Sequence, residues 1–139
     1  MSCSGRFDGS DRTVRNLALW VGQIVMAGFF VMAGSLKLFV PADDLARRMP
    51  YADGIPMELT RFIGVCELLG AAGLVLPGLA RDAAWLTPLA AAGLASIAAL
   101  ATLFHVGREE WASIPLPLGL AMYSVFIAWS RAGLAPLKR

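Results

Sequence analysis

Three ionisable side chains of this 139-residue sequence stand inside long apolar runs, where they could carry out acid–base chemistry. Glu67 lies in "RFIGVCELLGAAGLVLPG", Lys37 lies in "MAGSLKLF", and His105 ends the run "ATLFH". Carboxyl and imidazole groups serve as general acids and bases, and an ammonium group can polarise a carbonyl oxygen. An ionisable residue inside a membrane helix is a functional candidate by default. We therefore take Glu67, His105 and Lys37 as the candidate catalytic residues.

The composition indicates which solvent surrounds these runs. Hydrophobic residues make up 58% of the chain and charged residues only 16%, whereas an ordinary soluble domain is about a quarter charged. One small core cannot bury so much apolar surface, so the sequence predicts a single domain in a lipid bilayer. The formal net charge of +2, without a basic patch interleaved with aromatic residues, excludes a nucleic-acid partner.

Four apolar segments are each long enough to cross the bilayer, which takes roughly 20 residues. They are predicted at about 17–40, 57–79, 84–106 and 114–134, with proline and glycine between them. Residues 1–16 are polar and are expected to form an irregular tail. A soluble bundle would show polar stripes along its helices. A cleaved signal peptide would have a shorter apolar run and no acidic leader. The expected fold is an all-α integral membrane four-helix bundle.

The basic residues predict the orientation of the bundle. Positive charges favour the cytoplasmic side of a membrane protein, and the two sides differ in how many they hold. One side would carry Arg6, Arg12, Arg15, Arg81, Arg131, Lys138 and Arg139, and the other Arg47, Arg48 and Arg108. Both termini are therefore expected in the cytoplasm, with the protein in the inner (plasma) membrane.

Depth in the membrane brings the candidate residues into one region. In this orientation Lys37 lies near the outer end of the first helix and His105 at the outer end of the third. Glu67 lies about 9 Å further in than Arg61, at about 1.5 Å per residue. Helical side chains lean toward the N-terminus of their helix, so Lys37 and Glu67 lean toward each other. We expect Lys37 to be the first partner of Glu67, with Arg61 or His105 as the second.

Further polar residues share these helix faces and are predicted to bind a ligand: Gln23, Arg61, Thr102 and Arg108. Small residues accompany them, which lets helices approach one another and is compatible with a homodimer. The competing interpretation is structural. In it, the Lys37–Glu67 pair fixes the helix register, while Arg61 and Arg108 extend to the membrane interface.

Several sequence motifs that would indicate a metal or a bound cofactor are absent. The chain has no CxxC, HExxH, GxSxG, P-loop or dinucleotide fingerprint. We therefore predict no metal site and no encoded cofactor, so that any redox partner molecule would be lipid-soluble, as a quinone is.

Three motifs in order resemble the DoxX-like family of small four-helix membrane proteins. They are "MAGSLKLF", "RFIGVCELLGAAGLVLP" and "TPLAAAGL" followed by "ATLFHVGREE". The resemblance implies that Lys37, Glu67 and His105 occupy the polar positions of the family, for which no catalytic role is agreed. Members of that family include a membrane subunit linked to thiosulfate:quinone oxidoreductase and a mycobacterial partner in a membrane-associated oxidoreductase complex.

Three functions fit these observations. The first is a polar pocket that binds a small lipophilic molecule, with quinone as the leading candidate, in support of redox chemistry by an oxidoreductase subunit. The second is a cofactor-free acid–base enzyme (an isomerase, cyclase or epoxide-opening enzyme) that acts on an apolar substrate. The third is a non-enzymatic assembly or interaction subunit, in which the charges only hold the bundle together.

Overall fold

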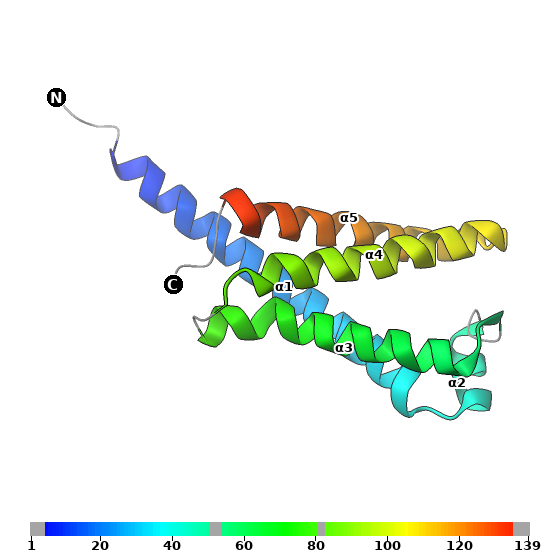
Figure 1. The fold of residues 1–139 in the computed structure, drawn as a ribbon. Coiled ribbons are helices and arrows are strands. Elements are labelled where there is room, and N and C mark those ends of the chain that lie inside the picture. The colour runs from blue at the N-terminus through cyan, green and yellow to red at the C-terminus, as the bar shows by residue number, and fades with distance from the viewer. Residues whose placement is uncertain (1–4, 51–53, 81–82, 135–139) are drawn as a thin grey trace.

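The regular structure of the chain is helical throughout the residues described by the computed structural model, which are 5–50, 54–80 and 83–134. No strand occurs within these ranges. The long helices run along the length of the molecule, and a short one lies at one end (Figure 1). The elements in chain order are α1 (Gly5–Phe39), α2 (Ala42–Arg48), α3 (Met57–Ala80), α4 (Leu86–Gly107), the 3₁₀ turn η2 (Trp111–Ser113), α5 (Pro115–Trp129) and the π-helical turn η3 (Ser130–Leu134).

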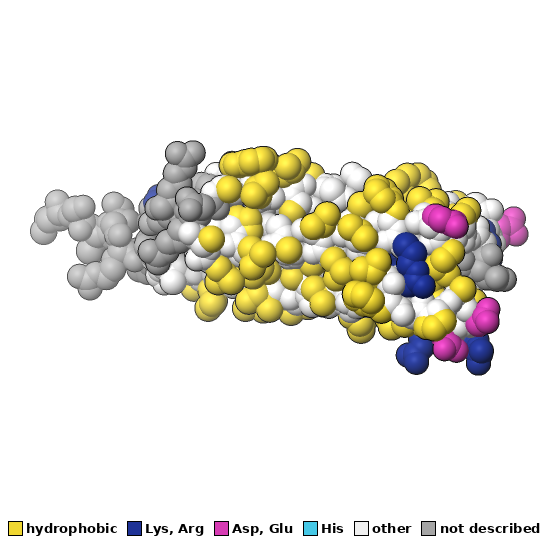
Figure 2. Space-filling view, turned by 60° about the horizontal axis from the view of Figure 1, so that its bottom comes forward, with side chains coloured by type: hydrophobic (Ala, Val, Ile, Leu, Met, Phe, Trp, Pro, Cys, Tyr) yellow, Lys and Arg dark blue, Asp and Glu magenta, His cyan; other side chains and the backbone are white. Residues whose placement is uncertain are grey.

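The four predicted membrane spans are confirmed. In the described part of the chain, four helical segments are long and apolar enough to cross a bilayer: Ser10–Phe39, Met57–Ala80, Leu86–Gly107 and Trp111–Gly133. Figure 2 shows hydrophobic side chains over the middle of one face, with charged side chains gathered mainly at the end that carries α2. This banding is what a multi-pass membrane protein requires, because lipid replaces water around the middle of the bundle.

The start of α1 differs from the expectation of an irregular tail over residues 1–16. Residues 5–16 are helical and continue directly into the first span; residues 1–4 lie outside the described part. Starting a helix is costly, but extending an existing one costs little per residue. The segment contains no proline to stop that extension, so its polar composition does not prevent helix formation.

The helices pack in the order of the chain. α1 lies against α3, α3 against α4, and α4 against α5, while α1 and α5 meet over a short stretch only. The start of α1 and the end of η3 lie at the same end of the bundle, here named the terminal end (Figure 1). The opposite end, which carries α2, is named the α2 end. That the terminal end faces the cytoplasm stays a prediction.

The two ends are separated by an apolar core in the middle of the bundle. Its buried members come from all four long helices and are Met26, Ala27, Phe30, Ala71, Leu74, Ala91, Leu94 and Ile127. In the lipid-facing parts of the molecule, water cannot satisfy polar groups. Most buried polar side chains therefore lie toward the two ends, where they form separate clusters. Ser124 is an exception, since its buried hydroxyl group donates to Sδ of Met26 in the core at 3.3 Å.

Two glycines set the closest approach of α1 and α3. A Cβ atom added to Gly34 would lie 2.8 Å from the carbonyl oxygen of Gly64, and one added to Gly64 would lie 2.9 Å from the carbonyl oxygen of Gly34. Each glycine thus faces the backbone of the other helix. Small residues at such a crossing let the helices pack closely in lipid, where van der Waals contact drives their association.

We predict that Gly34→Ala lowers the free energy of unfolding by about 1–3 kcal/mol, since the new methyl group meets a backbone atom that cannot move aside. Gly28→Ala in the same helix is the matched control, because no atom lies within 4 Å of its added Cβ. The control should be neutral or stabilising by up to about 1 kcal/mol. Reversible unfolding in mixed lipid–detergent micelles measures both, and equal effects of the two variants would contradict the close crossing.

Candidate functional site

The charged pair expected between the first two spans is present. The Nζ atom of Lys37 donates hydrogen bonds of 2.6 and 2.7 Å to Oε1 and Oε2 of Glu67. The two side chains are only 9% and 5% exposed. Either charge alone inside a membrane span costs about 2.5–3.5 kcal/mol on insertion scales, so each group compensates much of the cost of the other.

The close helix crossing positions this pair. The Cβ atom of Glu67 lies 3.2 Å from the site of an added Cβ on Gly34, and the Cβ atom of Lys37 lies 3.1 Å from that on Gly64. Each charged residue therefore begins beside the glycine of the opposite helix. The separation of α1 and α3 at this point lets the ammonium group reach both carboxylate oxygens at once.

Arg61 holds the end of α1 that carries the lysine. Its Nη1 donates to the carbonyl oxygen of Lys37 at 2.8 Å, and its Nη2 donates to that of Val40 at 2.9 Å. The last carbonyl groups of a helix have no partner within the helix, and a basic side chain can satisfy them. Arg61 thus joins α3 to the end of α1, and the structure brings Lys37, Glu67 and Arg61 together at the α2 end.

His105 belongs to a neighbouring cluster with its own carboxylate. Its buried imidazole Nδ1 lies 2.7 Å from Oε2 of Glu110. The other oxygen of Glu110 accepts a 2.6 Å hydrogen bond from Nε of Arg108. Glu109 adopts a left-handed φ of 58°, and the turn allows the Glu110 N–H to reach the His105 carbonyl oxygen at 3.0 Å. His105 was expected at this end of the bundle, but its pairing with Glu110 was not predicted from the sequence.

These contacts lower the pKa of Glu110. The hydrogen bond from Arg108 is the larger cause and the contact with His105 the second, since both favour the ionised carboxylate. The guanidinium of Arg108 also lies 5.4 Å from the ring centre of Phe104. Its Nη1 occupies the space where a side chain on Gly54 would stand. Arg108 therefore connects the end of α4 with the loop that precedes α3.

The remaining two predicted ligand residues are engaged elsewhere. The hydroxyl group of Thr102 donates to the Ala98 carbonyl oxygen one turn earlier, at 2.8 Å. Gln23 lies fourteen residues before Lys37 on the same helix, which is about 21 Å along its axis. Its Nε2 donates to the carbonyl oxygen of Leu74 at 2.6 Å. Gln23 is thus part of the terminal end and not of the site around Glu67.

Gln23 also accepts a hydrogen bond from Arg131, which was counted above only among the basic residues that predict the cytoplasmic side. Arg131 is only 3% exposed. Its Nε donates to Oε1 of Gln23 and its Nη1 to Oδ1 of Asn16, both at 2.6 Å, and the guanidinium lies 5.7 Å from the Trp20 ring centre. A signal was present in the sequence, because Asn16 and Gln23 are seven residues apart and share one helix face.

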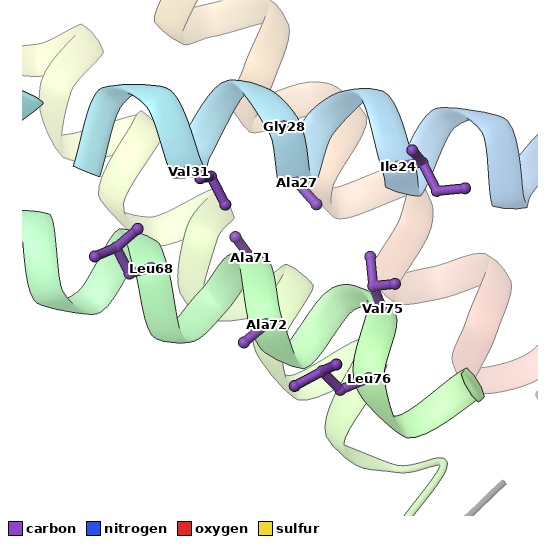
Figure 3. A pocket seen from close by; sticks show the side chains of 9 residues that line it. All are labelled: Ile24, Ala27, Gly28, Val31, Leu68, Ala71, Ala72, Val75 and Leu76. Carbon is purple, nitrogen blue, oxygen red and sulfur yellow. The ribbon is translucent and has the colours of Figure 1, made fainter. Parts of the chain in front are cut away.

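Two surface grooves accompany these clusters, and both are apolar. The first lies between α1 and α3 (Figure 3) and is lined by Ile24, Ala27, Gly28, Val31, Leu68, Ala71, Ala72, Val75 and Leu76. The second lies between α4 and α5 and is lined by Ala92, Ala95, Ser96, Ala99, Val125, Ala128 and Trp129. Neither lining includes a predicted site residue. Within the described residues, no group of three His, Cys, Asp or Glu side chains could hold a metal ion.

Comparison with known families identifies the chain. Residues 21–127 match the DoxX-like family, and this range contains the second and third spans completely and most of the first and fourth. The chain belongs to the DoxX-like family, as the motifs around Lys37, Glu67 and His105 indicated. No curated protein and no solved structure matches the chain.

We predict that removing one partner of the buried pair destabilises the fold more than removing both. Lys37→Met or Glu67→Gln alone should cost about 3–5 kcal/mol, because each leaves a partner without its hydrogen bonds. The double variant should cost less than either single variant, and therefore far less than the sum of the two. A double-mutant cycle of unfolding free energies in lipid–detergent micelles measures the coupling, and strict additivity would contradict the pairing.

We predict a pH-dependent contribution from Glu110. Since the pKa of Glu110 is lower in the folded protein than in the unfolded chain, its contribution to stability is complete above the ordinary pKa of glutamate. That contribution is lost as the pH falls through the lower, folded value. The stability difference between wild type and Glu110→Gln should therefore shrink as the pH is lowered from neutral to below the ordinary glutamate pKa of about 4.3.

The neighbouring Glu109→Gln is the control for this measurement. Glu109 carries the same charge and directly precedes Glu110, but among the described residues its side chain makes no hydrogen bond to His105 or Arg108. Its difference from wild type should stay nearly constant over that pH range. A Glu110→Gln difference that is equally constant would show that the carboxylate is not held by the two basic groups.

Proposed function

We propose that this DoxX-like membrane protein binds a small lipophilic molecule of the quinone class at Lys37, Glu67 and Arg61, in the outer half of the inner membrane. The single observation that carries the proposal is the buried Lys37–Glu67 pair inside two membrane spans. Charged residues at such depth are costly, and where they occur they commonly mark a substrate or proton site.

The chemistry of these groups suits a carbonyl-bearing head. A lysine ammonium has three N–H groups, and two of them serve Glu67. The third can donate to a carbonyl oxygen of the ligand, with the Glu67 carboxylate as the exchangeable proton site. Reduction of a quinone to a quinol takes up two electrons and two protons. In this proposal the electrons come from an oxidoreductase subunit that binds this protein, and Glu67 passes on protons.

His105 and Glu110 supply a second titratable pair at the same end of the bundle. Their 2.7 Å contact joins a buried imidazole to a carboxylate that is part of the loop after α4, which makes them candidates for proton exchange with the outer aqueous phase. An apolar core separates the polar groups at the two ends. This arrangement favours a binding site that opens at the α2 end and disfavours a polar path across the membrane.

One observation favours a second function. Both carboxylate oxygens of Glu67 are already satisfied by Lys37, as they would be in a purely structural pair. In that case the protein is a non-enzymatic assembly subunit of a membrane complex, and the pair sets the register of α1 and α3. The two functions differ in whether a ligand depends on the pair.

We therefore predict that gently purified wild-type protein retains a quinone or a similar lipophile, detectable by mass spectrometry, and that Glu67→Gln and Lys37→Met lose it. Glu58→Gln is the matched control, because it removes an exposed carboxylate from the first turn of the same helix and should retain the ligand. If every preparation carries bulk lipid only, while reconstituted quinone fails to bind, the assembly function takes precedence.

A further inference from the structure

The α1–α3 groove lies on the same helix faces as the polar groups at the α2 end. On α3, Leu68 forms one end of the groove lining, and Arg61 lies seven residues earlier. On α1, Val31 lines the same end, and Ser35 follows four residues later. Residues four or seven apart share one face of a helix. A path along the groove toward the α2 end therefore leads over Ser35 to Arg61.

The groups at the end of this path are able to bind a polar head. Arg61 and Ser35 are both half-buried. Arg61 uses Nη1 and Nη2 for one hydrogen bond each to α1, whereas a guanidinium has five N–H donors. Within the described residues, the Ser35 hydroxyl group makes no hydrogen bond to the protein. Both side chains retain donors for an acceptor oxygen of a ligand.

The groove itself has the size and surface of a hydrocarbon site. Its volume is about 410 Å³, within the range of about 300–1,000 Å³ that is common for small-molecule sites. Ala27 of α1 and Ala71 of α3 face each other between the two helices (Figure 3), and the rest of the lining is alanine, glycine and larger aliphatic residues. From Leu68 to Leu76 it extends about 12 Å along α3. No atom lies within 4 Å of an added Cβ on Gly28, so the groove is open there.

We infer that the ligand is an amphiphile with one long hydrocarbon tail, which lies in the α1–α3 groove while an acceptor oxygen of its head binds Arg61 and Ser35. This inference rests on the proposed function, because it assigns the tail of the same ligand. If the tail occupies this groove, compact lipophiles without a tail are not the preferred ligands of the protein. A whole helix is about 10–12 Å across with its side chains, so a single chain suits the groove between two packed helices better than a second copy of the protein does.

The test compares two probes in lipid nanodiscs: a benzoquinone without a tail and the same head with a long isoprenoid tail. Binding is followed by quenching of tryptophan fluorescence. Gly28→Leu fills the groove from an open position, and Ala72→Leu fills it from α3. Gly93→Leu is the matched control, because its added Cβ also meets no atom within 4 Å and it lies on α4. All variants are measured in the same lipid. Partitioning of the tail into the bilayer therefore contributes equally to the apparent affinity of every variant for a given probe.

We expect Gly28→Leu and Ala72→Leu to weaken binding of the tailed probe by about tenfold or more, with little effect on the tailless probe. Gly93→Leu should bind both as wild type does. Equal affinities for the two probes, each sensitive to Glu67→Gln, would overturn the tail site and leave the proposed function standing. Tail-dependent binding that is unchanged in Glu67→Gln would keep the tail site and overturn the proposed function.

Two other outcomes would also overturn the tail site. If neither probe binds wild-type protein, the proposed function and the tail site both fall. If Gly28→Leu changes the oligomeric state of the protein in nanodiscs and leaves the affinity for the tailed probe unchanged, the occupant of the groove is a second copy of the chain, and the tail site is wrong.

Discussion

The cost of placing charge in a hydrocarbon solvent is the constraint on which the structure depends. Lys37 and Glu67 can occupy their depth only because they meet at 2.6 Å, and they can meet only because Gly34 and Gly64 let α1 and α3 cross closely. Arg61 then holds the end of α1 in place through two carbonyl groups. Helix crossing, charge pairing and helix capping are thus parts of one arrangement at the α2 end.

The same constraint explains why the polar residues form separate clusters. Around the apolar core, polar side chains find partners at the two ends: Lys37 with Glu67 and His105 with Glu110 at one, and Gln23 with Arg131 at the other. Gln23 also reaches the carbonyl oxygen of Leu74 on α3. It therefore joins α1 to α3 and η3, and fixes the terminal end while the α2 end carries the proposed site.

The span positions and the Lys37–Glu67 pair could be predicted from the sequence, because apolar length and helix depth determine both. The partner of His105 could not be predicted, because the contact depends on a left-handed backbone conformation at Glu109. The sequence gives no sign of such a conformation where the residue is not glycine. Arg131 was counted only as a positive charge near the cytoplasmic end of the fourth predicted span, because burial by a neighbouring helix is not visible locally. The helical start at Gly5 was missed because polar composition was taken as a sign of irregular structure.

The most direct measurement is solid-state NMR of protein with ¹⁵N-labelled lysine and ¹³C-carboxyl-labelled glutamate in bilayers, with and without a quinone. Lys37 and Lys138 are the only lysines of the chain, so Lys37→Met assigns the two signals. The account predicts that the Lys37 Nζ signal shows dipolar coupling to the Glu67 carboxylate and shifts when quinone is added, while that of Lys138 stays unchanged. A coupled Lys37 signal that does not respond to quinone would contradict the ligand site and leave only the structural pair.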